Sequence, residues 1–376
     1  MKQQFNTAAH RETATTIRDA IMAKSVTAQM VGGTMLGLVE ATSEIIEALG
    51  NLETERVTVK VNAYDGTERV SVAGAKVYID IFCNSGVPNF AVPRKEVEVD
   101  ENGEVSFEVY KGFQYSVFSK LTGLSASFQF SFEACQDERV IELWNFPIGV
   151  FMFGRVGYYN EDTDGYRYVP FVTNTYDSDH SSEAEWDMQE GEVADEEYYN
   201  SILVATAETA FVIDQDTKAE NTMPWVGNRY YGKLIPAMPA YNDKTCEDME
   251  AAQTAARADY DGNLNTAKIL AFCRDAKAAE YCANVMAAFN RQLFLPAAGQ
   301  LYLMYLNKAA INALMEDAND DGCSFDLIDN NWYWSSTQYD EWCAWNVTLN
   351  NGNTDHDHRY YDYYVRAVSA FLSFDA

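Results

Sequence analysis

The spacing of the apolar residues changes near residue 53, and this change constrains the fold more than any other feature of the chain. Between Thr13 and Leu49 the apolar residues recur at intervals of three and four, which is the spacing of a helix that buries one stripe. From Glu55 to Trp144 apolar and polar residues alternate one by one, which is typical of strands with one buried face. The sequence therefore predicts a helical segment followed by a β domain.

The predicted N-terminal segment, residues 1–52, has two interpretations. Eight of the ten positions along its seam, from Ile17 to Leu49, are apolar. A stripe of this length fits a coiled coil, and it equally fits a helix that packs on its own domain. Gly32 and Gly33 interrupt the stripe, and glycine weakens a helix interior. We expect this segment to attach or oligomerise the protein.

Residues 53–146 are predicted to form a β-sandwich. Alternating runs begin at Val57, Val77 and Val105, and a turn at Asp100–Gly103 precedes the last of them. Short strands separated by Asn-Gly and Asp-Gly turns are typical of antiparallel sandwiches. The pattern VSVAGAKVYIDI followed by VDENGEVSFEVYKGFQYSV resembles the prealbumin-like and immunoglobulin-like modules that serve as spacers in surface proteins. The resemblance implies a spacer without chemistry.

Residues 147–376 mix strand and helix patterns, which predicts an α+β domain. No Lys or Arg lies between Arg167 and Lys218, whereas 13 acidic residues do, most densely in Asp177–Glu197. A solvated loop is the common role of such a segment, and calcium binding is the alternative. The expected strands are Gly149–Val156 and Ser201–Ile213, and the expected helices are Cys246–Ala258, Thr266–Gln292 and Gln300–Glu316.

Charge and cysteine content exclude several classes of partner. The 376 residues include 57 Asp and Glu against 27 Lys and Arg, a formal charge of −30, which repels phosphate backbones and anionic lipids. We expect neither nucleic acid binding nor membrane insertion, because the least charged stretch, Ser25–Val39, is too short to span a bilayer. The N-terminus lacks the apolar core of a signal peptide. Seven scattered Cys without a CxxC pair indicate free thiols in a reducing cytoplasm.

Two sets of polar residues could bind metal, and both are incomplete. Asp317–Gly322 matches the first six positions of an EF-hand loop, but Ile328 occupies the twelfth, where a bidentate Glu is required. We interpret it as a helix end and an acidic turn. His356 and His358 would share a face of a strand, without a third ligand at a fixed spacing. No GxSxG, phosphate-loop, HExxH or dinucleotide motif has a supporting context. We expect no cofactor, no metal and no catalysis.

The C-terminal stretch Trp332–Tyr364 concentrates aromatic residues. It holds four of the seven Trp and six Tyr, and 15 of the 19 residues in Asn346–Tyr364 are Asn, Asp, Tyr, His or Thr. These types are encoded by AAC and by its single changes at adenine, as adenine-directed mutagenesis would produce; a low-complexity loop is the alternative. Tyr and Trp supply rigid contact area, while Asn, Asp and His supply adaptable hydrogen bonds. The composition favours a recognition surface.

Five short motifs lie between residues 258 and 371. They are ADYDGNLNT (Ala258–Thr266), AAEYC (Ala278–Cys282), FLPAAGQL (Phe294–Leu301), YWSST (Tyr333–Thr337) and VRAVSAF (Val365–Phe371). Together they resemble the C-type-lectin-fold variable proteins that retroelements diversify, among them phage tail receptor-binding proteins and variable proteins of gut bacteria. In that family, the codons between the YWSST strand and the closing strand are rewritten, and their side chains cluster on one exposed face.

The resemblance implies a C-type-lectin-like domain in residues 147–376, with the YWSST and VRAVSAF motifs as scaffold. Trp342 and Trp345 could be fixed scaffold as well, because Trp is not reached from an Asn codon by adenine changes. The implied ligand-binding residues are Tyr339, Asp340, Trp342, Trp345, Asn346, Thr348, Asn350, Asn353, Asp355, His356, Asp357, His358, Tyr360, Tyr361, Asp362 and Tyr363.

The resemblance further implies a receptor-binding protein at the tip of a phage tail fibre. It would be a virion component assembled in the host cytoplasm, joined to other tail or baseplate proteins through its N-terminus, and would bind a protein or glycan receptor on the host cell. A homotrimer is expected from the family, and clustered heads would gain avidity. A bacterial surface-displayed adhesin is the alternative. A third hypothesis is an enzyme like the formylglycine-generating enzymes, with Cys323 or Cys343 as the reactive thiol.

Overall fold

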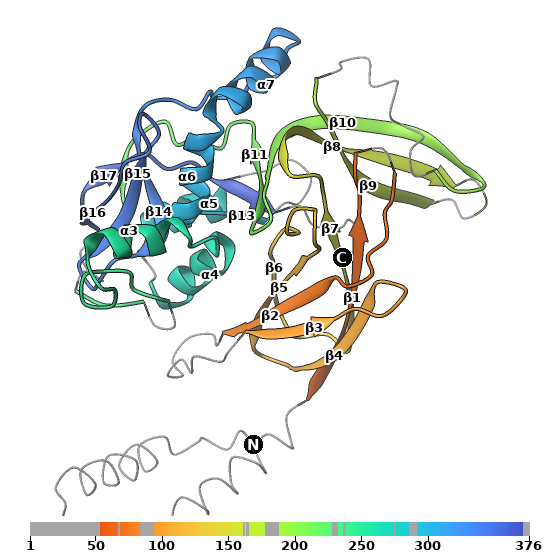
Figure 1. The fold of residues 1–376 in the computed structure, drawn as a ribbon, viewed down its shortest axis with the longest axis horizontal. Coiled ribbons are helices and arrows are strands. Elements are labelled where there is room, and N and C mark those ends of the chain that lie inside the picture. The colour runs from red at the N-terminus through yellow and green to blue at the C-terminus, as the bar shows by residue number, and fades with distance from the viewer. Residues whose placement is uncertain are drawn as a thin grey trace, which may run out of the picture. The chain divides into compact units, whose positions relative to one another are not determined.

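The computed structural model describes residues 53–66, 68–82, 94–160, 162, 165–176, 188–227, 232–235, 238–273, 275–285 and 292–370. Contacts divide the chain into two units, Met1–Thr54 and Glu55–Ala376. The helical segment expected in residues 1–52 lies outside the described residues, and so do residues 177–187 of the acidic segment. Figure 1 shows the fold of the remainder.

The described residues between 54 and 145 form a β-sandwich of two sheets, which confirms the predicted β domain. The strand orders are β4-β1-β7 and β3-β2-β5-β6. Val57, Val59 and Val61 of β1 are buried, because alternate side chains of a strand point to the same face. The strands are β1 (Thr54–Ala63), β2 (Lys76–Phe82), β3 (Lys95–Glu98), β4 (Glu104–Tyr110), β5 (Gln114–Lys120), β6 (Phe130–Glu133) and β7 (Glu138–Asn145).

One pairing in the sandwich differs from the predicted antiparallel arrangement. β1 and β7 run parallel, with Val57 opposite Arg139, whereas the pairs of the other sheet are antiparallel. Parallel neighbours need a long crossover connection. The turn motifs in the sequence mark hairpins only, so they could not predict this pairing of the first and last strands. The predicted turn at Asp100–Gly103 is present, since the Gly103 amide donates to the Asp100 carbonyl.

The remaining described residues form an α+β domain around a six-stranded sheet, in the order β13-β18-β11-β10-β8-β9. β8, β9 and β10 make the long ribbon seen in Figure 1. Sheets β14-β15-β16 and β12-β17 complete the domain. No helix in the described ranges is long and apolar enough to cross a lipid bilayer. The elements are β8 (Gly149–Asn160), β9 (Gly165–Thr173), β10 (Glu192–Ala205), β11 (Ala210–Asp214), β12 (Met223–Pro224), α3 (Met249–Arg257), α4 (Gly262–Phe272), α5 (Lys277–Asn284), β13 (Gln292–Phe294), α6 (Ala298–Leu306), α7 (Lys308–Asp320), β14 (Trp332–Gln338), β15 (Cys343–Thr348), β16 (Thr354–His358), β17 (Asp362–Tyr363) and β18 (Val368–Ala370).

Three predicted elements are each divided in the structure. The predicted helix Thr266–Gln292 is α4 and α5 followed by β13, because the extended backbone of Cys273 ends α4. The predicted helix Gln300–Glu316 is α6 and α7, separated by one residue. The predicted strand Ser201–Ile213 is the end of β10 and β11, joined by a turn at Thr206–Thr209. None of these breaks contains Gly or Pro, the residues by which a sequence marks a break.

The sandwich and the α+β domain share a hydrophobic core. Phe128 and Phe146, at one end of the sandwich, pack on Phe153 of β8, with ring centroids 5.5 and 5.7 Å from the Phe153 ring. All three are buried in the same cluster as Trp345. Burying a large apolar side chain stabilises a fold by about 1.5–3 kcal/mol. The predicted boundary after residue 146 therefore passes through a packed core.

Candidate recognition face

Three of the sequence motifs meet in a buried hydrogen-bond network beneath the candidate face. The Ser336 amide donates to the Pro296 carbonyl over 2.8 Å, which joins YWSST to FLPAAGQL. The Thr337 hydroxyl accepts the Ala298 amide over 2.9 Å and donates to the Asp259 carboxylate over 2.8 Å. Ser336, Thr337 and Asp259 are buried. The network fixes β14, on which β15 pairs and then β16.

Arg359 anchors the loop that follows β16. Its side chain is fully buried. The guanidinium donates to the carbonyl oxygens of Lys233, Asp340 and Cys343 and to the side-chain oxygen of Gln338. A planar guanidinium can serve several acceptors at fixed angles, which a lysine ammonium cannot. The loop after β16, the β14–β15 turn and the segment at Lys233 are thus held by one side chain.

The surroundings of Arg359 are apolar as well as polar. Its guanidinium carbon lies 4.7 Å from the centre of the Trp225 ring, a cation–π arrangement. Burial lowers the pKa of Arg359 to about 10, so that the group stays charged at neutral pH. Arg359 is the only Lys or Arg in residues 338–364. Sequence reasoning missed this residue, since it lies among the positions expected to vary.

The exposed aromatic side chains gather beside Arg359. His358, Tyr360 and Tyr361 contact one another with ring-centroid distances between 4.9 and 5.8 Å, and these three residues define the aromatic patch. Tyr360 and Tyr361 are each 43% exposed. Trp342, 41% exposed, adjoins the patch because its carbonyl accepts the Arg359 amide. Rings held against one another lose little conformational entropy when a partner binds.

Two carboxylates beside the patch are held by hydrogen bonds. Asp340 accepts the amides of Trp342 and Cys343, each over 2.7 Å, and thereby shapes the turn between β14 and β15. Asp357 accepts the Tyr363 hydroxyl over 2.7 Å. Burial and this carboxylate raise the pKa of Tyr363. The patch is therefore bordered by fixed negative charge.

The residues expected to face the ligand divide into three groups by exposure. Those that are buried lie mainly on β15, the central strand of its sheet, whose side chains pack on both faces. The exposed surface is therefore narrower than the sequence implied. The exposed residues are Trp342, Asn350, Asn353, Asp355, Tyr360, Tyr361 and Asp362; the half-buried ones are Asp340, His356, Asp357, His358 and Tyr363; the buried ones are Tyr339, Trp345, Asn346 and Thr348.

The two histidines of β16 have different surroundings. His356 stacks on Tyr339, with ring centroids 3.7 Å apart and 5° between the planes. His358 belongs to the aromatic patch, and its Nδ1 lies 3.8 Å from Cys343 Sγ. Burial raises the pKa of Cys343 to about 12, so the thiol is protonated at neutral pH and is a weak nucleophile. Cys323 Sγ lies 3.5 Å from the Tyr176 hydroxyl.

The acidic and histidine patterns do not assemble into a metal site within the described ranges. No three His, Cys, Asp or Glu side chains there are placed to hold an ion. The residues that matched an EF-hand loop end α7, with Asp321 as its cap and Gly322 at a φ of +102°, which agrees with a helix end and turn. In the acidic segment, Glu192 pairs with Arg167 over 2.6 Å.

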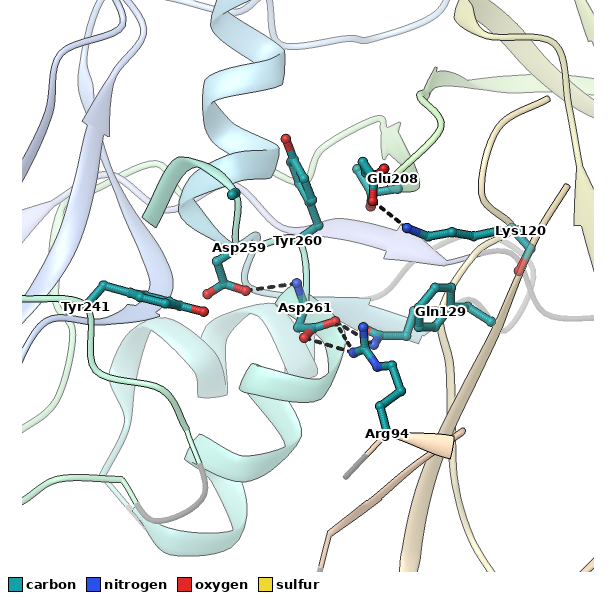
Figure 2. Close-up of a pocket in the computed structure, with 12 residues that line it drawn as sticks. Arg94, Lys120, Gln129, Glu208, Tyr241, Asp259, Tyr260 and Asp261 are labelled. Atoms are coloured by element: carbon teal, nitrogen blue, oxygen red, sulfur yellow. Dashed lines mark hydrogen bonds and ion pairs between the residues drawn. The ribbon is translucent and has the colours of Figure 1, made fainter. Parts of the chain in front are cut away.

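A second candidate site lies between the sandwich and the α+β domain (Figure 2). It is a cavity of about 140 Å³. Arg94 donates to both carboxylate oxygens of Asp261, over 2.9 and 3.0 Å, and also to Asp80. Lys120 pairs with Glu208. Because these cations and carboxylates pair with each other, the cavity is better suited to joining the two parts than to capturing a charged ligand.

Asp259 is the buried carboxylate of this cavity, and Figure 2 shows Tyr241 pointing toward it. It accepts the Asp261 amide over 3.0 Å, the Asn265 side-chain amide over 2.9 Å and the Thr337 hydroxyl. Burial and the charge of Asp261 raise the pKa of Asp259 to about 6. Sequence reasoning placed Asp259 in a motif but did not predict this role, because its partners lie far apart in the chain.

Comparisons with known proteins concern the strand arrangement alone. No protein-family model matches the chain, and no curated protein matches it. A fimbrial protein from Bacteroides ovatus is 11% identical, with 85% of this chain and 71% of that chain covered and a TM-score of 0.36. The shaft pilin SpaA from Lactobacillus rhamnosus GG is 10% identical, with coverages of 44% and 90% and a TM-score of 0.20. A streptococcal ancillary pilin is 14% identical, with coverages of 44% and 60% and a TM-score of 0.20. No function follows from likeness at this level.

Proposed function

We propose that this chain is a non-enzymatic binding protein displayed at a surface, and that it contacts its partner through the aromatic patch and Trp342. The observation that carries the proposal is the position of exposed, mutually packed rings directly beside the buried Arg359. Because Arg359 holds the scaffold beneath the patch in place, the patch loses little conformational entropy on binding. The β-sandwich would serve as the spacer beneath this face.

The same proposal includes the origin of the face. Residues 147–376 would be a C-type-lectin-like head whose exposed positions a retroelement diversifies. In support, the YWSST and FLPAAGQL motifs hydrogen-bond to each other in the core, while the exposed positions after YWSST are rich in Asn, Asp and Tyr. A template repeat that differs from codons 338–364 only at adenines, next to a reverse transcriptase gene, is the expected genomic finding. Its absence would contradict this part of the proposal.

Two settings for display are proposed, in order. The first is the surface of a bacterium, where the chain would act as an adhesin. The second is a phage tail fibre, which the sequence resemblance alone favours. A homotrimer is proposed in both, because several heads would bind with avidity. Neighbouring genes distinguish the settings: secretion and surface-assembly genes support the first, and tail and baseplate genes support the second.

The test of binding removes the rings without disturbing the scaffold. We expect the double variant Tyr360→Ala/Tyr361→Ala to lose at least about 10-fold in affinity for cells or surface extracts that the unmodified protein binds, since interface aromatics often contribute 2 kcal/mol or more. Binding is measured with fluorescently labelled full-length protein. Tyr363 is left in place because its ring packs on Trp334 and its hydroxyl bonds to Asp357.

Tyr110 supplies the matched control. It is 40% exposed on the sandwich, so Tyr110→Ala removes a comparable exposed ring far along the chain. We expect this variant to bind as the unmodified protein does. If the double variant binds normally while its unfolding curve is unchanged, the recognition surface lies elsewhere.

A further inference from the structure

The charges around the aromatic patch are strongly one-sided. Residues 338–364, all of which the structure describes, contain five acidic residues. Asp355 and Asp362 are exposed, and Asp340 and Asp357 are half-buried. Glu341 is half-buried as well, and its carbonyl accepts the Gly232 amide. The rings therefore lie in a field of carboxylates.

The only Lys or Arg of this stretch, Arg359, lies below the surface. Arg359 is fully buried and donates to oxygens of the scaffold, so it presents no charge to a partner. Four cations among the described residues border the stretch. Lys233 is exposed, and Arg257 is half-buried with its guanidinium on the Thr354 hydroxyl and the Gly352 carbonyl. Lys308 donates to the Leu349 carbonyl over 3.0 Å, and Lys218 lies 5.2 Å from the centre of the Tyr364 ring. The carboxylates still outnumber these cations.

Exposed tyrosines beside carboxylates are the surroundings that a basic side chain prefers. A guanidinium or ammonium is attracted to the face of an aromatic ring, and it pairs with carboxylates in fixed geometry. The formal charge of −30 on the whole chain would also draw a cationic partner toward the protein and repel an anionic one. The ring chemistry and the charge thus point to the same kind of partner.

We propose that the partner of this face is a basic protein surface, contacted through arginine and lysine side chains that lie on Tyr360 and Tyr361 and pair with Asp355 and Asp362. This inference rests on the proposed binding function and specifies its partner. The same charges repel acidic glycans and nucleic acids. A polypeptide fits better than a cationic polysaccharide, because guanidinium groups both stack on rings and bind carboxylates bidentately.

The test uses the full chain and three labelled peptides that differ only at four positions, which are Arg, Gln or Glu. We expect the Arg peptide to bind at least about 10-fold more tightly than the Gln peptide at low salt, with no detectable binding of the Glu peptide. Raising the salt to physiological ionic strength should weaken the Arg peptide by several-fold, because exposed charges are screened over about 8 Å. A chitosan oligomer serves as the cationic polysaccharide probe.

Two double variants, each lacking two carboxylates, show which carboxylates contribute to binding of the Arg peptide. Asp355→Asn/Asp362→Asn should weaken the Arg peptide by about 5-fold or more. Glu101→Gln/Glu108→Gln removes the same number of carboxylates from exposed positions on the sandwich and should change the affinity less than about 2-fold. Both variants retain the hydrogen-bonding side chains of the scaffold.

Several outcomes would overturn the proposal. Equal weakening by the two charge variants would mean that only the total charge acts, and a preference for the chitosan oligomer would mean a different class of partner. The Arg and Gln peptides could bind with equal affinity, and Tyr360→Ala/Tyr361→Ala could abolish the binding of both. This result would support the proposed recognition face but contradict a basic partner. If the tyrosine variant changes neither peptide binding nor cell binding, the proposed function itself fails.

Discussion

Single buried charges hold the candidate face in place, and they are stabilised in different ways. Arg359 is surrounded by carbonyl oxygens and the Gln338 side chain, which satisfy its donors without neutralising it. Asp259 accepts three hydrogen bonds, yet burial and Asp261 still raise its pKa to about 6. Burial likewise lowers the pKa of Arg359, to about 10. Arg359 therefore stays charged at neutral pH, whereas Asp259 titrates close to it.

The raised pKa of Asp259 predicts a pH dependence of stability. Between its ordinary value of 3.8 and about 6, the folded chain holds a proton on Asp259 that the unfolded chain releases, so folding is favoured as the pH falls through this window. Relative to Asp259→Asn, we expect the unfolding free energy of the unmodified protein to rise by about 1 kcal/mol from about pH 7 to about pH 5. Urea unfolding curves across this range measure it.

The control for this prediction is Asp362→Asn, which removes an exposed carboxylate. It should follow the unmodified protein across the range, because both retain Asp259. A constant difference between the unmodified protein and Asp259→Asn would mean that Asp259 is ionised throughout. At the residue scale, neither Arg359 nor Asp259 could be predicted, since their roles depend on partners such as Lys233 and Thr337 that are distant in the chain.

The short turn between β15 and β16 determines where β16 begins. Gly352 has a φ of +72°, a conformation that side-chain-bearing residues rarely adopt. A Cβ at this position would lie 2.3 Å from Cε1 of Tyr305 on α6. The Gly352 amide donates to the Thr348 carbonyl. The turn is thus both left-handed and packed against a helix.

Gly352→Ala should destabilise the protein by more than backbone strain alone. We expect a loss of about 2 kcal/mol or more, from about 1 kcal/mol of strain and the displacement of the Tyr305 ring. Gly112→Ala is the matched control: its φ is +82°, and nothing lies within 4 Å of the added Cβ, so it should lose only about 1 kcal/mol. Equal losses in the two variants, measured by urea unfolding, would contradict the predicted clash.

Elements were predictable where one periodicity ran between clear turns. The sandwich strands follow from alternation, and α3 from the spacing over Cys246–Ala258. The division of Thr266–Gln292 could not be predicted, because Ala-rich residues continue the helical spacing through Cys273. The burial of β15 could not be predicted either, since its central place in the sheet depends on pairing with β14 and β16.

Across the whole described molecule, the core unites segments that the sequence separated. Phe128, Trp144 and Phe146 belong to the cluster that also contains Phe153 and Trp345. Outside this core, Arg94 of the sandwich also pairs with Asp261 of the α+β domain across the cavity. Two domains that share a core cannot move as independent bodies on a flexible linker.

Truncation tests this unity. We expect a chain that begins at residue 147 to lose cooperative unfolding, because it lacks three buried aromatic side chains that together contribute roughly 5 kcal/mol or more. A chain that begins at residue 53 retains them and should unfold in one transition. Near-ultraviolet circular dichroism during heating measures both. A cooperative transition in the shorter chain, at the temperature of the longer one, would show that residues 147–376 fold alone.

If a retroelement diversifies the gene as proposed, the position of Arg359 would restrict which variants can fold. Arginine is encoded both by triplets that contain adenine, such as AGA, and by triplets that do not, such as CGC. Mutagenesis confined to adenines would destroy the anchor in many offspring of a gene with AGA at codon 359, whereas CGC would pass unchanged. The choice between synonymous codons, invisible in the protein, would then decide how much of each new generation still displays a usable face.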